Sequence, residues 1–214
     1  MKIYASSFRL CSDPTRLRSL FANSTRVAVI SNALDFSSDI ARRDRGVAAE
    51  LTALSRLGLQ PKVVDLRDFF GSPDATQSML QDFDGVWVLG GNVFTLRRAF
   101  RYTGLDHLLD EIAKSDVPFV YAGYSAGSCI LGPTLDGIHL VDPPELPAEG
   151  YAAEIIWEGL SLLPFSIAPH FKSNHPESSM IDGVVEYFEA HGLPYRTLRD
   201  GESIVISNEG RAVA

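Results

Sequence analysis

Short apolar runs alternate with helix-like patterns along most of the chain. Val27–Ser31 is typical of a strand buried on both faces of a parallel sheet, because it is continuous, apolar and rich in β-branched residues. Comparable runs predict four more strands, at Lys62–Leu66, Gly85–Leu89, Pro118–Ala122 and Phe165–Ala168. Ser203–Ser207 and Arg211–Ala214 are expected to pair as a terminal hairpin around Asn208-Glu209-Gly210.

Helical periodicity fills the stretches between these strands. Asp39 or Ser38 is expected to cap the first helix, which stops near Gly58. Its apolar positions, spaced by four and three residues, are Val47, Leu51 and Leu54. Further helices are expected from about Phe94 to Phe100, at Leu105–Lys114 and at Glu177–Ala190. The last of them carries an apolar face made of Met180, Val184 and Phe188.

This alternation predicts a single α/β domain over residues 1–214. We expect three layers, with a mostly parallel central sheet and helices on both of its faces. The proline-rich segment Asp136–Gly150 interrupts the regularity and predicts a long excursion, a kind of loop that often carries function. Reactive groups are expected at the carboxyl ends of the strands, as in other open α/β sheets.

Composition and charge narrow the class of protein. The 214 residues are 45% hydrophobic and 21% charged, which supports a packed core and excludes global disorder. A formal net charge of −8 without a long basic cluster argues against a nucleic-acid partner. No apolar run approaches the roughly 20 residues of a membrane span, so no membrane partner is expected. The N-terminus lacks a secretory apolar region, and Cys11 and Cys129 are interpreted as reduced thiols of a cytoplasmic protein.

The motif G-x-S-x-G at residues 123–127 is the sharpest chemical signal. A predicted strand precedes it and a helix-compatible stretch follows, which is the setting of a nucleophile elbow centred on Ser125. The alternative is a tight turn in which Ser125 only caps the helix. Ser128 is the competing serine, but it would lie one turn into the helix, so we discount it as a nucleophile.

A serine nucleophile requires a base, and His170 is the preferred histidine because it follows an apolar strand. His175 is the second choice, with capping of the next helix as its alternative role. The remaining histidines are interpreted as surface, helix-end or loop residues: His107, His139 and His191.

The acid that orients the base is expected at Asp200, on a turn that leads into a strand. Glu202 is the neighbouring alternative. Asp136 and Asp142 would instead give the order serine, acid, histidine that is seen in α/β-hydrolases.

A second glycine-rich turn, Gly90-Gly91-Asn92, follows one predicted strand and precedes a helix. It lacks the lysine and the spacing of a phosphate-binding loop. An acyl-transfer site needs backbone N–H donors close to the substrate, so we interpret the turn as part of an oxyanion hole.

Four motifs occur in the order found in the peptidase E (aspartyl dipeptidase) and cyanophycinase family, which the chain resembles from about Val27 to Ser207. They are Gly90-Gly91-Asn92-Val93-Phe94-Thr95-Leu96, Gly123-Tyr124-Ser125-Ala126-Gly127, Pro169-His170-Phe171 and Asp200-Gly201.

The resemblance implies a fold related to class I glutamine amidotransferases, with no metal or organic cofactor. It implies Ser125 as nucleophile, His170 as general base and Asp200 as the orienting acid. It also implies that the N–H groups of Gly91 and Ala126 form the oxyanion hole and that Asn92 contacts substrate.

The expected function is therefore that of a cytoplasmic serine exopeptidase, which hydrolyses dipeptides or short peptides through an acyl-enzyme. The segment after Pro133 departs from aspartyl dipeptidase, which leaves the preference for an N-terminal aspartyl residue open. Cations near the site in sequence, each more simply read as a solvated charge, are Arg97, Arg98, Arg101 and Lys172. The alternatives are an esterase, a cyanophycinase-like hydrolase and a non-catalytic binding domain, and either a monomer or a homodimer is compatible with the sequence.

Overall fold

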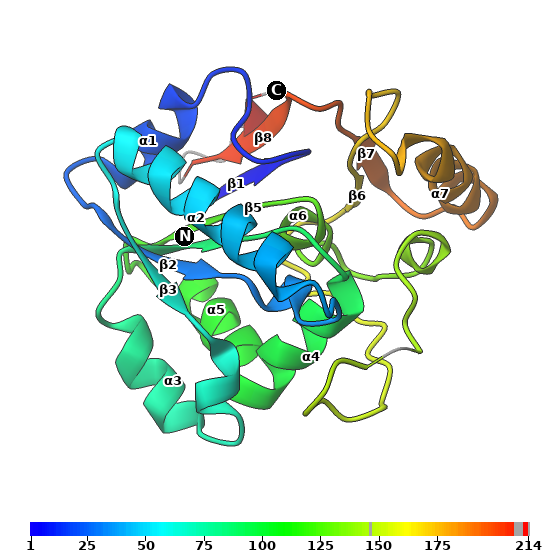
Figure 1. Cartoon of the computed structure of the whole chain (residues 1–214). Helices are drawn as coiled ribbons and strands as arrows, with labels where there is room; N and C mark the ends of the chain where they lie inside the picture. The colour runs from blue at the N-terminus through cyan, green and yellow to red at the C-terminus, as the bar shows by residue number, and fades with distance from the viewer. Residues whose placement is uncertain (146, 208–211, 214) are drawn as a thin grey trace.

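The computed structural model describes residues 1–145, 147–207 and 212–213. Within them the chain forms a seven-stranded sheet in the order β3-β2-β4-β5-β1-β8-β9 (Figure 1). The strands are β1 Lys2–Ser6, β2 Arg26–Ile30, β3 Gln60–Val64, β4 Gly85–Val88, β5 Val120–Tyr124, β8 Ser203–Ile206 and β9 Ala212–Val213. Those from β3 to β1 run parallel, whereas β8 and β9 are antiparallel to their neighbours. The mostly parallel sheet predicted from the sequence is confirmed.

Helices cover both faces of this sheet because the strand side chains alternate between two apolar cores. In β2, Val27 and Val29 point into one core, and Ala28 and Ile30 point into the other. The first core is closed by α1 Thr15–Phe21 and α2 Ile40–Arg56. The second core is closed by α3 Pro73–Leu80, α4 Val93–Thr103 and α5 Leu105–Lys114. The three layers expected from the sequence are present (Figure 1).

A small second unit lies beside the main sheet. It consists of the parallel strands β6 Ser166–Ala168 and β7 Tyr195–Thr197 and the helix α7 Ser178–Ala190 (Figure 1). The predicted strand at Phe165–Ala168 therefore forms, but it pairs with β7 instead of joining the main sheet. Short helices complete the fold: α6 Ala126–Cys129, η1 Asn32–Leu34, η2 Leu66–Phe69 and η3 Ile138–Leu140.

Local chemistry explains where most elements begin and end. Asp39 caps α2 by accepting a 2.9 Å hydrogen bond from the N–H of Arg42, so Asp39 and not Ser38 is the cap. The helix α5 has the bounds that the sequence predicted. The strand β5 begins two residues later than predicted, because Pro118 has no N–H to donate to a ladder. The apolar face of α7 is Ile181, Val184 and Phe188, while Met180 is exposed.

The sequence interpretation missed the central strand β1, which pairs with β5 on one side and β8 on the other. Its run of five residues is short and contains Ala5 and Ser6, so it carries a weak strand signal. The helices α1 and α3 and the strand β7 were also not predicted. The terminal hairpin is confirmed by the pairing of β8 with β9, and its expected turn at Asn208–Gly210 lies outside the described residues.

Two further features concern the cysteines and the apolar character of the helices. Cys11 and Cys129 are both free and buried. No helix in the described part of the chain has the length and apolar character needed to cross a bilayer.

Candidate active site

Ser125 occupies a strained turn between β5 and α6. Its backbone has φ 49° and ψ −118°, a conformation that is rare for a residue with a side chain. The N–H of Ser125 donates to the carbonyl of Ser7 at 3.0 Å, which fixes the turn against the end of β1. A Cβ on Gly127 would lie 2.3 Å from the carbonyl oxygen of Val88, so the helix can approach β4 only because this residue is glycine. The elbow predicted from the sequence is thus formed, and Ser125 lines a cavity of about 520 Å³.

Ser128 has a structural role instead. Its hydroxyl is buried and donates to the carbonyl of Ser6 at 2.8 Å, with the carbonyl of Gly123 a further 3.0 Å acceptor. These contacts tie α6 to β1 and β5, and they leave the hydroxyl of Ser128 directed away from any substrate.

His170 lines the same cavity as Ser125, and its ring is held by Asp200. Nδ1 of His170 lies 2.8 Å from Oδ1 of Asp200. Since an ionised carboxylate only accepts hydrogen bonds, Nδ1 carries the proton and Nε2 is left with a free electron pair. Burial lowers the pKa of His170 below its ordinary value of 6.5, while the hydrogen bond to Asp200 opposes this shift and the neighbouring His175 adds to it. The imidazole is therefore neutral at neutral pH.

Ser7 links the serine turn to the histidine–carboxylate pair. Its buried hydroxyl donates to Oδ1 of Asp200 at 2.7 Å and accepts the N–H of His170 at 2.7 Å. The same residue also supplies the carbonyl that holds the N–H of Ser125. Sequence reasoning missed Ser7, because a serine at the end of an unrecognised strand carries no motif.

The other acids considered from the sequence do not contact His170 among the described residues. Glu202 accepts the N–H of Arg199 at 2.8 Å, Asp136 accepts from the hydroxyl of Thr134, and Asp142 accepts the N–H of Val93 at 2.8 Å. Each of these carboxylates therefore stabilises a turn or a helix end.

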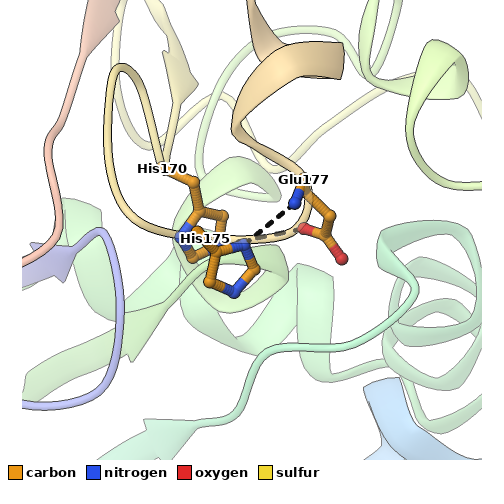
Figure 2. Close-up of side chains that lie close together, drawn as sticks. All are labelled: His170, His175 and Glu177. Atoms are coloured by element: carbon orange, nitrogen blue, oxygen red, sulfur yellow. Dashed lines mark hydrogen bonds and ion pairs between the residues drawn. The ribbon is translucent and has the colours of Figure 1, made fainter.

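His175, the alternative base, stacks on His170 with ring centroids 3.7 Å apart and 8° between the ring planes (Figure 2). Both rings line the cavity together with Glu177. The structure thus brings the two histidines together, and only His170 is hydrogen-bonded to a carboxylate in the manner of an oriented base.

The backbone N–H groups of Gly91 and Ala126 have no acceptor among the described residues, and Gly91 lines the cavity beside Ser125. Gly91 has φ 141°, and a Cβ there would lie 2.3 Å from the carbonyl oxygen of Ala33. Only glycine fits at this position, so the turn after β4 can pack against η1. A Cβ on the preceding Gly90 would lie 2.9 Å from the Cβ of Ser125, so glycine there lets the turn pass directly beside Ser125.

Asn92 does not line the cavity. Its side chain is buried, Oδ1 accepts the N–H of Thr95 at 2.8 Å, and Nδ2 donates to the carbonyl of Pro143 at 3.0 Å. In the structure Asn92 caps α4 and anchors the excursion through Pro143.

The four cations near the site in sequence do not line the cavity, and the interpretation of them as solvated charges is wrong for the buried Arg97 and Arg98. Arg97 and Arg101 both pair with Asp106 at 2.9 Å. Arg98 is fully buried and donates to backbone carbonyls of the excursion, and Lys172 lies over the ring of Phe171. These four residues position segments of the chain and do not line the cavity.

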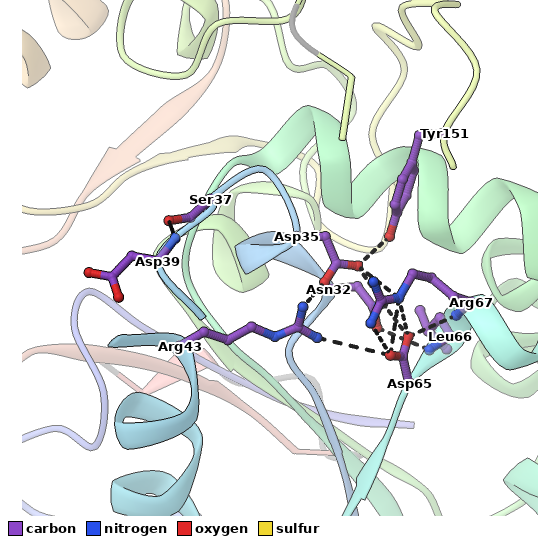
Figure 3. Close-up of polar contacts among 9 residues, drawn as sticks. All are labelled: Asn32, Asp35, Ser37, Asp39, Arg43, Asp65, Leu66, Arg67 and Tyr151. Carbon is purple, nitrogen blue, oxygen red and sulfur yellow. Dashed lines mark hydrogen bonds and ion pairs between the residues drawn. The ribbon is translucent and has the colours of Figure 1, made fainter. Parts of the chain in front are cut away.

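A different set of arginines lines the cavity: Arg9, Arg42, Arg43 and Arg45. Three of them come from the first turns of α2, which shares the cavity with Ser125. Arg9 pairs with the buried Glu50 at 3.4 Å, and Arg43 forms an ion pair with the buried Asp35 (Figure 3). Within the described residues no acidic side chain pairs with the guanidinium of Arg42 or Arg45. We call these four arginines the arginine wall. Its signal in the sequence was the high density of arginine at residues 42–45.

Tyr151 fixes the excursion to this wall. Its hydroxyl donates a 2.6 Å hydrogen bond to Asp35, the partner of Arg43 (Figure 3). Asn32 donates to both Asp35 and Asp65, which joins the ends of β2 and β3 to the same network. The carboxylate of Asp35 therefore contacts both Tyr151, at the end of the excursion, and Arg43 of the arginine wall.

Comparison with known sequences places these features in a family. The family model for peptidase family S51 matches residues 16–213. A probable alpha-aspartyl dipeptidase of Drosophila melanogaster is 30% identical over 164 residues, which are 74% of this chain and 64% of that protein. Peptidase E of Streptomyces coelicolor is 30% identical over 170 residues, or 76% of this chain and 64% of that protein. The chain thus matches slightly less than two thirds of the length of either relative.

A shorter relative is matched more fully. An uncharacterized peptidase of Listeria innocua is 32% identical over 164 residues, which are 76% of this chain and 73% of that protein. Among solved structures, that of a peptidase E candidate from Listeria monocytogenes superposes with a TM-score of 0.73 at 24% identity, covering 99% of this chain and 96% of that one. This likeness supports the fold described above.

Proposed function

Because this chain belongs to peptidase family S51, we propose that it is a serine peptidase that hydrolyses dipeptides or short peptides, with Ser125 as its nucleophile. One observation carries the proposal. The hydroxyl on the strained serine turn and the neutral, carboxylate-bound imidazole of His170 line one cavity. A serine hydroxyl and a neutral imidazole that line one cavity supply the nucleophile and the base that acyl transfer requires.

The first half of the reaction acylates Ser125. Its oxygen attacks the scissile carbonyl carbon while Nε2 of His170 takes the hydroxyl proton, and the carbonyl electron pair moves onto the oxygen. The free N–H groups of Gly91 and Ala126 would receive this developing negative charge. Collapse of the intermediate breaks the carbon–nitrogen bond, and Nε2 gives its proton to the leaving amine.

The second half releases the product with water as the nucleophile. His170 takes a proton from water as the water oxygen attacks the acyl-enzyme carbonyl, and it returns that proton to Ser125 as the ester bond breaks. Asp200 keeps the Nδ1 proton in place throughout, so that Nε2 can accept and donate in turn. Burial of His170 favours the neutral form that this cycle requires at its start.

We further propose that the cavity favours peptides with an acidic N-terminal residue. Its volume of about 520 Å³ is in the range of small-molecule sites. The guanidinium groups of Arg42 and Arg45 have no acidic partner among the described residues, whereas those of Arg9 and Arg43 are already paired. A substrate carboxylate would supply the missing partner for Arg42 or Arg45. The Drosophila relative carries the name of an aspartyl dipeptidase, which agrees with such a preference.

The test combines active-site labelling with turnover. A fluorophosphonate is expected to label the wild-type chain stoichiometrically and to leave Ser125→Ala unlabelled. Ser37→Ala is the matched control, because Ser37 lines the same cavity and its hydroxyl accepts the N–H of Asp39. Persistent labelling of Ser125→Ala would exclude Ser125 as nucleophile, and an unlabelled, folded wild-type chain would exclude the serine mechanism.

Turnover then separates the substrate classes. An Asp-X dipeptide, a Leu-X dipeptide and a simple acyl ester are compared at equal concentration. Faster hydrolysis of Asp-X supports the proposal, equal rates for Asp-X and Leu-X contradict the acidic preference, and hydrolysis of the ester alone contradicts the peptidase assignment.

A further inference from the structure

Three side chains with metal-binding atoms meet beside the cavity: His170, His175 and Glu177 (Figure 2). One potential ligand atom from each lies within 4.8 Å of the other two. Nε2 of His170 is 4.0 Å from Oε2 of Glu177, and the two imidazole rings are stacked. Only this group of three or more histidines, cysteines or acidic residues is close enough to hold an ion in the part of the chain that the structure describes.

The loop between β6 and α7 creates this cluster by folding back on itself. His170 and Lys172 adopt positive φ angles of 59° and 49°, which turn the chain sharply after β6. The N–H of Ser178 then donates to the carbonyl of His175 at 3.0 Å, which places His175 and Glu177 at the start of α7. Phe8 packs against both imidazole rings, with centroid distances of 5.9 and 5.4 Å. The loop thus holds the two rings and the carboxylate close together.

The electron pairs that a metal would need are available. Nδ1 of His170 bonds to Asp200, so its Nε2 is free to donate an electron pair. Nδ1 of His175 already acts as an acceptor, because it takes the N–H of Glu177 over a long 3.3 Å contact. A metal–nitrogen bond would replace this weak contact. The carboxylate of Glu177 is 39% exposed and has room to move toward the two rings.

The donor set and its surroundings favour a zinc-like ion. Two imidazoles and one carboxylate, with a fourth position left for water, are a common zinc ligand set. Metal-bound histidines usually donate their second ring N–H to a carboxylate, and Asp200 already provides this contact for His170. Ligand atoms around tetrahedral zinc are about 3.3 Å apart, given metal–ligand bonds of about 2.0–2.1 Å. His175 would have to tilt away from its stacked position, since parallel rings do not direct their electron pairs at one point.

We propose that His170, His175 and Glu177 form a reversible, inhibitory binding site for a Zn²⁺-type divalent ion. The ion would bond to Nε2 of His170, the atom that takes the proton of Ser125 in the proposed peptidase reaction. The inhibitory effect therefore rests on the proposed function, whereas the binding itself does not. No oxidation or group transfer is involved: the ion is bound by electron pairs of neutral imidazoles and an ionised carboxylate, and chelation releases it unchanged.

Direct binding is measured first, by isothermal titration with ZnCl₂ and by the visible absorption of bound Co²⁺, on a chain without a histidine tag. We expect one ion per chain and an intense, tetrahedral-type Co²⁺ spectrum. His175→Gln and Glu177→Gln should each lower the affinity at least about tenfold, because each removes one of three ligands. His191→Gln is the matched control, since His191 stacks on Tyr187 at the end of α7 and does not line the cavity.

Activity is measured second. Zn²⁺ should inhibit dipeptide hydrolysis at concentrations that match its dissociation constant, and EDTA should restore the full rate. The Ser125→Ala chain should still bind the ion, so the metal site and the proposed function can fail separately. An absence of binding to the wild-type chain, or an affinity in both His175→Gln and Glu177→Gln that equals that of the wild-type chain, would overturn the site. Stoichiometric binding that leaves hydrolysis unaffected would overturn its inhibitory role.

Discussion

The hydroxyl of Ser7 donates a 2.7 Å hydrogen bond to Asp200, and it is this contact that connects the first strand of the sheet to the carboxylate beside His170. Ser7 also accepts the N–H of His170 and supplies the carbonyl for the N–H of Ser125. A single buried residue at the end of β1 therefore fixes the relative positions of the proposed nucleophile, base and acid.

Replacing Ser7 with alanine is expected to reduce kcat on the order of 10- to 100-fold, because the orientation of His170 and Asp200 relaxes. The N–H of His170 loses its acceptor in a buried place, which should cost about 1–3 kcal/mol of unfolding free energy. Steady-state kinetics and urea unfolding measure the two effects. Ser203→Ala is the control, since the buried hydroxyl of Ser203 has no hydrogen-bond partner among the described residues. A Ser7→Ala chain with wild-type kcat would show that Ser7 is only structural.

Asp200→Asn tests the identity of the acid. The amide of asparagine can donate to Nδ1 and so favour the wrong imidazole tautomer, and kcat should fall by about 10³- to 10⁴-fold. Glu202→Gln should stay close to wild type, because within the described residues the carboxylate of Glu202 is hydrogen-bonded only to the N–H of Arg199, at 2.8 Å. Hydrolysis rates of the two purified variants decide between the carboxylates, and a larger loss in Glu202→Gln would contradict the assignment of Asp200.

The pH profile should reflect the burial of His170. Because burial lowers its pKa, the imidazole stays neutral at pH values where an exposed histidine is protonated. The acid limb of kcat/KM should therefore have its midpoint below 6.5, and activity should fall only as the pH drops through that lowered value. His175→Gln removes the neighbouring imidazole that helps to lower the pKa of His170 and should move the midpoint upward, while His191→Gln should leave it in place. A midpoint at or above 6.5 in the wild-type chain would contradict a buried, neutral base.

The arginine wall should determine the preference for acidic substrates. Arg42→Ala and Arg45→Ala, alone and combined, are expected to raise KM for an Asp-X dipeptide by about 10- to 100-fold, the value of a hydrogen bond to a charged group. Hydrolysis of Leu-X should change little, because an apolar side chain cannot accept hydrogen bonds from a guanidinium. Arg56→Ala is the control, since Arg56 lies at the other end of α2 and outside the cavity. Equal increases in KM for Asp-X and Leu-X would instead indicate a general effect on folding.

The local part of the structure could be predicted from the sequence because its causes are local. The apolar runs and the cap at Asp39 act over a few residues, so strand–helix alternation follows from them. The serine turn could be predicted from the G-x-S-x-G motif, although Gly127 is required by the distant Val88. The partnership of His170 with Asp200 was one of several open choices, since 30 residues separate the two and the sequence does not say how the chain returns between them.

The amino-acid sequence by itself determined that this chain forms a layered α/β domain with a strained serine turn, because periodicity and glycine chemistry are encoded residue by residue. Only the tertiary structure decided which distant groups meet. It placed β1 in the centre of the sheet, Ser7 against Asp200, the arginines of α2 across from Ser125, and Glu177 beside two stacked histidines. These contacts depend on the packing of segments far apart in the chain. Local sequence patterns do not predict which of these segments will come into contact.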